Sequence, residues 1–258
     1  MTHCDNPPPT PPGRPRAPLR RALLAALHKL CRPFRRIFLD QMPLQEFADY
    51  NHYWEQRATP FVHPRYARVA REIPPTGRLL DIGCGDGTFL EHVRSVSPDL
   101  DLMGIDVSEV AIARLREKGI HGEVCDLTAP GFTLPTEVDY VVVMEMLEHI
   151  AEPERVMRVL HTLDATRYYI TIPNLGHIEH RLRLMFAGKM PVTAIVHHIK
   201  EHLRFWTVAD FKHWSDVMGF RIVNYYGQNG TLFLWRLWPS LFAMQMIYEL
   251  ETKPTING

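Results

Sequence analysis

From residue 78 onward, short apolar runs alternate with amphipathic segments. Runs rich in Val, Ile, Leu and Tyr predict strands, and segments with apolar residues at three- and four-residue spacing predict helices. The predicted strands lie near 78–82, 101–106, 121–125, 138–144 and 167–172, and the helices near 87–96, 108–118 and 153–164. This alternation predicts a parallel sheet made of βαβ units.

The chain after residue 206 predicts one more helix and two closing strands. Thr207-Val-Ala-Asp210 has the order of a capping box, and Gly219 is a natural stop for the helix that it opens. Strands are predicted at 221–226 and 244–251. The interval 231–242 is an apolar insertion rich in Leu, Phe and Trp, too short and broken to span a bilayer.

The first 76 residues follow a different pattern. Residues 6–18 are rich in proline and predict disorder. Residues 19–30 carry an apolar stripe with basic flanks, and 34–39 repeat that mixture. Residues 44–72 predict two helices around Tyr53 and Trp54. The predicted organisation is a disordered head with a basic amphipathic helix (1–40), a helical lid (41–76), the main α/β domain (77–251) and a tail (252–258).

Charge changes this picture only at the head. The chain has 258 residues, 46% of them apolar, and no net charge. Residues 1–39 carry eight Lys/Arg and one acidic residue. Three explanations stay open for this head: a helix packed on its own domain, a helix lying on an anionic membrane, or a transit peptide. The core domain lacks a basic face, so a nucleic-acid partner is not favoured.

Cysteine usage and hydropathy bear on the compartment. The four cysteines are far apart and form no Cys-x-x-Cys pair, which fits a reducing compartment. There is no apolar run long enough for a transmembrane helix, and the head lacks the pattern of a secretory signal. We expect a cytoplasmic protein, with peripheral membrane contact through 19–39 and 231–242 as an open alternative. The oligomeric state is not predicted.

The candidate chemistry begins at Leu79–Leu90, where a strand ends in Asp81 and three glycines follow at alternate positions. Glycine lacks a Cβ, so this turn lets a ligand approach the backbone and the next helix N-terminus closely. Asp106 ends the second strand, where a carboxylate meets ribose hydroxyls in a doubly wound sheet. Asp126 ends the third strand and is placed for an adenine amino group, with Leu127 against the ring.

These motifs together resemble class I S-adenosylmethionine (SAM) methyltransferases over residues 78–173. The resemblance rests on the glycine turn, on Glu145-Met-Leu-Glu148-His149 after the fourth strand, and on Pro173-Asn174 after the fifth. It implies a Rossmann-like, mostly parallel seven-stranded sheet with helices on both faces, SAM as cofactor, and a segment before the turn that covers the cofactor. The implied cofactor-binding residues are Asp81, Gly83, Cys84, Gly85, Gly87, Asp106, Val107, Asp126, Leu127 and Glu145.

A closer resemblance covers about 75–225. The stretch Ile172 to Thr193, with Pro-Asn-Leu-Gly-His followed by a basic segment and Gly-Lys-Met-Pro, resembles the MetW-like methyltransferase-fold family and, more broadly, the methyltransferase type 11 and 23 families. That family has a helix in the basic segment. The head and the apolar insertion lie outside the pattern.

Histidines are the candidates for acid–base chemistry. His149 follows the fourth strand, and His202 belongs to a histidine-rich roof at about 175–206 that also holds His177, His180, His197 and His198. A neutral imidazole near its ordinary pKa suits a general base. No metal is expected, although Glu145, Glu148 and His149 are spaced i, i+3, i+4, so that with His202 they form a weak candidate site for magnesium or manganese.

Two functions follow. The leading one is a SAM-dependent methyltransferase that methylates oxygen or nitrogen of a small-molecule or lipid-linked acceptor. The alternative is a MetW-like accessory protein that has the methyltransferase fold and regulates a partner enzyme. The sequence does not identify the acceptor, because acceptor pockets lie in the variable roof.

Overall fold

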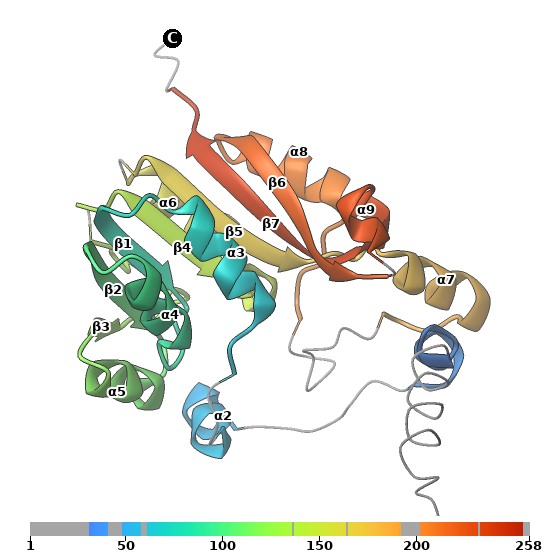
Figure 1. Cartoon of the computed structure of the whole chain (residues 1–258), viewed down its shortest axis with the longest axis horizontal. Helices are drawn as coiled ribbons and strands as arrows, with labels where there is room; N and C mark the ends of the chain where they lie inside the picture. The colour runs from blue at the N-terminus through green and yellow to red at the C-terminus, as the bar shows by residue number, and fades with distance from the viewer. Residues whose placement is uncertain are drawn as a thin grey trace, which may run out of the picture.

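The computed structural model describes residues 31–40, 48–57, 61–135, 137–163, 165–191, 202–231 and 233–254. Its centre is a seven-stranded sheet in the order β3-β2-β1-β4-β5-β7-β6 (Figure 1). The predicted helix at 19–30, like His197 and His198, lies outside the described residues.

Five strands run parallel, as the alternating pattern predicts. They are β1 (Gly77–Ile82), β2 (Leu100–Asp106), β3 (His121–Val124), β4 (Tyr140–Met144) and β5 (Arg167–Pro173). The helices between them are α4 (Thr88–Val96), α5 (Glu109–Glu117), the short 3₁₀ helix η2 (Leu147–His149) and α6 (Pro153–His161). Ser108 caps α5, because its side chain accepts from the Ala111 amide.

The last two strands run antiparallel to their neighbours. They are β6 (Phe220–Gly230) and β7 (Ala243–Thr252), preceded by α8 (Val208–Val217). The Thr207–Asp210 capping box opens α8 as predicted. β6 continues four residues beyond its predicted end at 226, because it pairs with β7 as far as Gly230 and Ala243. The apolar insertion folds into η3 (Leu234–Arg236) and α9 (Pro239–Phe242).

Two apolar layers cover the sheet, one on each face. Alternate residues of a strand point to opposite faces, so Leu79 and Leu80 belong to different layers. One layer packs β-strand residues against α6 and α8, through residues such as Met157 and Phe211. The other packs them against α3 (Pro64–Glu72), α4 and α5. The fold is therefore the doubly covered, mostly parallel α/β sheet expected.

Three elements lie beyond the carboxyl ends of the parallel strands (Figure 1). They are α2 (Tyr50–Gln56), α7 (Ile178–Ala187) and the single π-helical turn η1 (Arg35–Leu39). α7 is the helix that the MetW-like resemblance implied. No described helix is both long and apolar enough to cross a bilayer.

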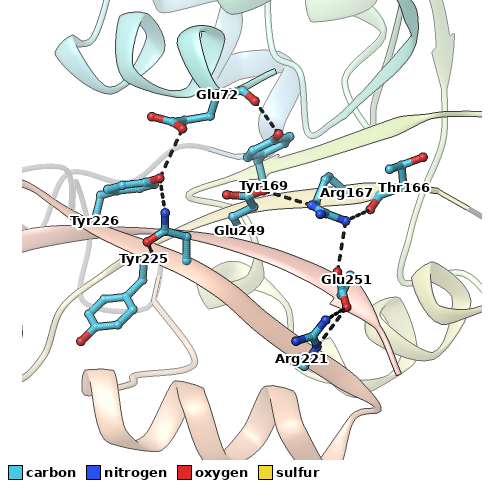
Figure 2. A network of polar contacts seen from close by, with 10 residues as sticks. Glu72, Thr166, Arg167, Tyr169, Arg221, Tyr225, Tyr226, Glu249 and Glu251 are labelled. Atoms are coloured by element: carbon cyan, nitrogen blue, oxygen red, sulfur yellow. Dashed lines mark hydrogen bonds and ion pairs between the residues drawn. The ribbon is translucent and has the colours of Figure 1, made fainter. Parts of the chain in front are cut away.

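A polar network holds α3 on the antiparallel edge of the sheet (Figure 2). Tyr169 donates to the Glu72 carbonyl (2.7 Å), and Tyr226 donates to the Glu72 carboxylate (3.2 Å). Farther along β5, Arg167 pairs with Glu249 and Glu251 of β7. The two tyrosine contacts fix the carboxyl end of α3, whose amino end lies beside the glycine turn.

Candidate functional site

The glycine turn joins β1 to α4, as predicted. Gly83, Gly85 and Gly87 all have positive φ angles, and the Gly83 and Cys84 amides donate to the Ile105 carbonyl. A Cβ on Gly87 would lie 2.2 Å from Leu115, and one on Gly85 would lie 2.3 Å from Trp54. The glycines are thus required both by the backbone conformation and by close packing.

Asp106 lies at the end of β2 and is tied to the turn. Its two carboxylate oxygens accept from the Gly85 and Ser108 amides, each at 2.9 Å. Burial raises the pKa of Asp106, while these amides oppose the rise. The carboxylate therefore stands next to the turn at the strand end, where the sequence predicts a ribose contact.

Asp81 is a buried carboxyl group at the end of β1, with 1% of its surface exposed. Its Oδ1 atom has no hydrogen-bond partner in the part of the chain that the structure describes. Burial, and then the charge of Asp106, raise the pKa of Asp81 to about 8. A buried acceptor without a partner is costly, so this position favours a ligand that brings a donor or a positive charge.

Arg65 is a candidate that the sequence analysis missed. It lies in the first turn of α3, is 6% exposed, and its Nε and Nη1 atoms have no hydrogen-bond partner among the described residues. Buried guanidinium nitrogens without hydrogen-bond partners favour an anionic ligand group. The available signal was its spacing, since Arg65, Val69 and Ile73 recur every four residues and both apolar members are buried.

Tyr66 connects Arg65 to the turn. Its ring packs on Phe89 of α4 at 5.4 Å between centroids. Burial raises the pKa of Tyr66 to about 12, and its hydroxyl also feels the charges of Arg65 and Asp81. The Arg65 guanidinium lies 5.4 Å from the centroid of the Tyr66 ring, so a buried cation and a tyrosine that is sensitive to the Asp81 charge lie beside the glycine turn.

Helix α2 lies over this region. Trp54 packs on Gly85, and the Asn51 side-chain oxygen accepts from the Ser108 hydroxyl at 2.7 Å. Arg114 of α5 donates to the Arg57 carbonyl at 2.8 Å. Asn51, Trp54 and Arg57 fasten α2 over the carboxyl ends of β1 and β2, which is the position a lid needs. Covering the cofactor remains a prediction.

Asp126 follows β3 at the neighbouring strand end. Its Oδ1 accepts from the amide and hydroxyl of Thr128, and these bonds lower the pKa of Asp126. The Cys125 amide donates to the Asp106 carbonyl, so the predicted ribose and adenine contacts lie on adjacent strand ends. Val107 is exposed and Leu127 is buried. The individual roles of these residues remain predictions.

Glu145 does not join Glu148 and His149 on one helical turn, and this part of the metal hypothesis is wrong. Glu145 has a φ of 50°, and the helical turn begins only at Leu147. Its carboxylate accepts from the Thr171 hydroxyl at 3.0 Å and from the Gln245 amide at 3.1 Å. The i, i+3, i+4 argument fails because it presumes a helix that already includes residue 145.

His149 and His202 do come together. Their rings lie 4.8 Å apart, and the His149 Nε2 atom lies 4.0 Å from a Glu148 oxygen. The Leu203 and Arg204 amides donate to the Glu148 carbonyl, which holds the roof against the loop after β4. The roof and the strand-four loop therefore build one site, as the sequence predicts.

His202 is neutral in this site. Burial, and then His149, lower the pKa of His202 to about 3, and neither ring nitrogen has a hydrogen-bond partner among the described residues. One ligand atom each from Glu148, His149 and His202 lies within 4.8 Å of the others. This geometry suits proton transfer to a neutral imidazole, and it also has the donor atoms of a small cation site.

His177 and His180 belong elsewhere in the roof. Both are buried beside η1 and α7, and their rings lie 5.5 Å apart. Burial lowers the pKa of His177 to about 4 and that of His180 to about 3. They are packing residues of α7 rather than neighbours of His149.

Comparison with known proteins agrees with this geometry. Among curated proteins, the chain is 30% identical over 133 residues to the ubiquinone biosynthesis O-methyltransferase of Pseudomonas fluorescens, covering 46% of this chain and 56% of that one. The match to the enzyme of the same name from Pseudomonas entomophila is 24% identical over 206 residues, covering 73% and 87%. The chain thus matches just over half the length of the first relative.

Solved structures share the fold at low sequence identity. A TehB-like SAM-dependent methyltransferase from Corynebacterium glutamicum superposes with a TM-score of 0.52 at 17% identity, covering 79% of this chain and 96% of that one. The methyltransferase CalO6 superposes with a TM-score of 0.53 at 20% identity, covering 77% and 64%. The sheet and the glycine turn are therefore those of the class I SAM-dependent methyltransferase fold.

The family model described as "Methionine biosynthesis protein MetW" matches residues 63–250, from the start of α3 into the last strand, β7. That interval holds the glycine turn, the strand ends with Asp106 and Asp126, and the His149–His202 site. The chain belongs to the MetW family.

Proposed function

We propose that this protein is a SAM-dependent methyltransferase that transfers a methyl group to oxygen or nitrogen of a small-molecule or lipid-linked acceptor. One observation carries the proposal: Asp81 and Arg65 are buried near Tyr66 and the glycine turn, and Asp81 Oδ1 with Arg65 Nε and Nη1 have no hydrogen-bond partner among the described residues. The amino-acid end of SAM carries an ammonium and a carboxylate. The ammonium can pair with Asp81, and the carboxylate can pair with Arg65.

The remaining cofactor contacts follow the strand ends. We assign the ribose hydroxyls to Asp106, because an ionised carboxylate accepts two adjacent hydroxyls strongly. Asp126, Val107 and Leu127 are assigned to adenine. Gly83, Cys84, Gly85 and Gly87 give the backbone its close approach, and Glu145 is the candidate on the β4 side.

Methyl transfer mainly requires that the acceptor atom be held in line with the methyl group. Where the acceptor carries a proton, it also requires a base. When bound, SAM supplies an electrophilic methyl group. We assign the base to His149, which faces neutral His202 and lies beside Glu148. His202 and Glu148 orient its ring, and Trp54 with α2 keeps water from the turn.

The relatives favour an oxygen acceptor. The curated proteins that match are named as ubiquinone biosynthesis O-methyltransferases, which supports O-methylation in the proposal. The MetW family supports the alternative of an accessory protein that regulates a partner enzyme. The two differ in turnover, because only an enzyme converts SAM to S-adenosylhomocysteine.

The test is a screen of hydroxylated aromatic, amine and lipid-linked acceptors that measures release of S-adenosylhomocysteine. We expect release with at least one class of acceptor, and Asp106→Ala should abolish it. SAM binding without release across the whole panel would favour the accessory protein. No SAM binding at all would refute both assignments.

A further inference from the structure

Helix α7 has an unusual outer face. Its solvent-exposed positions include Leu184 (57% exposed), Met185 (70%) and Phe186 (64%), whereas polar His180 and Arg183 are buried. A surface helix normally buries its apolar stripe and exposes its polar residues. α7 has the reverse arrangement.

The inner face of α7 is polar because it holds η1. Arg183 donates to the backbone carbonyls of Arg36 (2.6 Å), Asp40 (2.7 Å) and Met190 (2.6 Å). Glu179 forms an ion pair with Arg36 at 3.2 Å, in which both side chains are 12% exposed. The apolar side chains of α7 face outward because its polar side chains face inward and bind η1.

Two other segments bring exposed apolar residues to the same end of the molecule (Figure 1). Phe34, just before η1, and Phe38, within it, are exposed, and their tilted rings lie 4.9 Å apart. In the insertion, Leu237 and Trp238 are exposed. Asn174 donates to the Ser240 carbonyl at 3.1 Å, so the insertion is fastened to the loop before α7. We call residues 31–40, 178–191 and 233–242 the apolar end.

The net positive charge of the apolar end indicates which partner covers it. These three segments carry seven Lys/Arg and two acidic residues, whereas the whole chain has no net charge. Both acids are paired with arginines, Asp40 with Arg35 and Glu179 with Arg36. Arg32, Arg181 and Arg236 are exposed. A second copy of this chain would bring like charges together, whereas an anionic lipid surface complements both the basic and the apolar side chains.

We propose that the apolar end docks on an anionic phospholipid bilayer, with α7 as its central element. The apolar end is joined to the His149–His202 site, because the Leu175 amide just before α7 donates to the Trp206 carbonyl, four residues after His202. Docking would thus bring the His149–His202 site close to the bilayer. A lipid-linked acceptor could then reach the site without leaving the bilayer completely. That last step rests on the proposed function, whereas docking itself does not.

The test is co-sedimentation of the full chain with vesicles of phosphatidylcholine, alone or mixed with phosphatidylglycerol. We expect tighter binding to the mixed vesicles and weakening by salt. Met185→Glu with Phe186→Glu should lower the affinity at least about tenfold, because two inserted side chains become charged. The matched control is Val96→Glu with Val217→Glu, at two exposed apolar positions outside the apolar end, and it should bind as the wild type does.

A second pair separates charge from apolar contact. Arg35→Glu with Arg236→Glu should remove the preference for phosphatidylglycerol. Titration with S-adenosylhomocysteine should be unchanged in both apolar-end variants, so failure of the cofactor assignment is measured separately. Equal vesicle binding by the wild type and the α7 variant would overturn the proposal. So would a dimer in solution that the α7 variant dissociates, because the occupant would then be a second copy.

Discussion

Two carboxyl groups at the carboxyl edge of the sheet, the buried Asp81 and the half-buried Glu145, have different surroundings. At β1 and α3, Asp81 and Arg65 are buried without a hydrogen-bond partner for some of their polar atoms among the described residues. At β4, β5 and β7, Glu145 is satisfied by Thr171 and Gln245. Burying a polar group costs free energy unless it is paired. We therefore expect a ligand to supply the missing partner of Asp81, whereas Thr171 and Gln245 already pair with Glu145.

The largest expected effect is on the chemical step. His149→Ala should lower the rate of methyl transfer by about 100- to 10,000-fold, because a positioned base is lost. Affinity for S-adenosylhomocysteine should stay within about twofold of wild type, since His149 is not among the residues assigned to the cofactor. Single-turnover rates and calorimetric titration measure the two quantities. A comparable loss of cofactor affinity would place His149 in the cofactor site.

Removal of metal sharpens the same prediction. If Glu148, His149 and His202 act without a cation, dialysis against a chelator should leave the rate unchanged. If they hold a divalent cation, the rate should fall and return when magnesium or manganese is added. The wild-type protein before dialysis is the control.

The next effect is on cofactor binding. Asp106→Ala should weaken binding of S-adenosylhomocysteine by about 100-fold, because it removes charge-assisted bonds to both ribose hydroxyls. The variant also frees the Gly85 and Ser108 amides, so its melting temperature must be measured alongside. Asp126→Ala, at an exposed position, is expected to cost less. An equal loss in the two variants would contradict the assigned roles.

The pH dependence tests Asp81. Because the pKa of Asp81 rises to about 8 in the fold, its protonation stabilises the cofactor-free protein at low pH, and this contribution is lost as pH rises toward 8. An ammonium group binds the ionised carboxylate, so cofactor affinity should increase by up to about tenfold per pH unit between pH 6 and 8. Asp81→Asn should flatten the slope. A wild-type affinity that is independent of pH would contradict the assignment.

The smallest effect is expected at Glu145. Glu145→Gln replaces one of the two carboxylate oxygens, which accept from Thr171 and Gln245, by an NH₂ group that cannot accept. This change should destabilise the fold by about 1 kcal/mol. Thermal unfolding measures this change. Cofactor affinity that falls as well would support the predicted cofactor contact of Glu145, and unchanged affinity would leave it a purely structural residue.

The local sequence pattern predicts the strands and helices of the sheet well. It predicts only some of the site residues at the carboxyl ends of the strands. Strand and helix periods, the Thr207–Asp210 box and the glycine turn are properties of neighbouring residues, so the sequence expresses them directly. Arg65 was missed because one arginine on an amphipathic helix usually lies in solvent, and only packing decides that it is buried. The grouping of Glu145 with Glu148 failed because a left-handed residue separates them.

The outward apolar face of α7 could not be foreseen for a related reason. Its cause is Arg183, which reaches the backbone of η1 about 145 residues earlier in the chain. Contacts between residues so far apart in the chain do not affect the periodicity of apolar residues within one helix. The resemblance to MetW-like proteins implied the helix but not the direction of its faces.

We propose that Arg65 and Asp81, some of whose buried polar atoms have no hydrogen-bond partner among the described residues, hold the amino-acid end of SAM beside the glycine turn. The most direct test is calorimetric titration of wild type, Arg65→Met and Arg68→Met with S-adenosylhomocysteine and with 5′-methylthioadenosine, which lacks the ammonium and the carboxylate. Arg68 is the control on the same helix: its Nε atom also lacks a hydrogen-bond partner among the described residues, but the guanidinium pairs with Glu72 and lies over the Tyr226 ring. We predict that Arg65→Met alone weakens S-adenosylhomocysteine by about 10- to 100-fold and leaves methylthioadenosine unchanged. Equal weakening of both ligands, or of neither, would contradict the account.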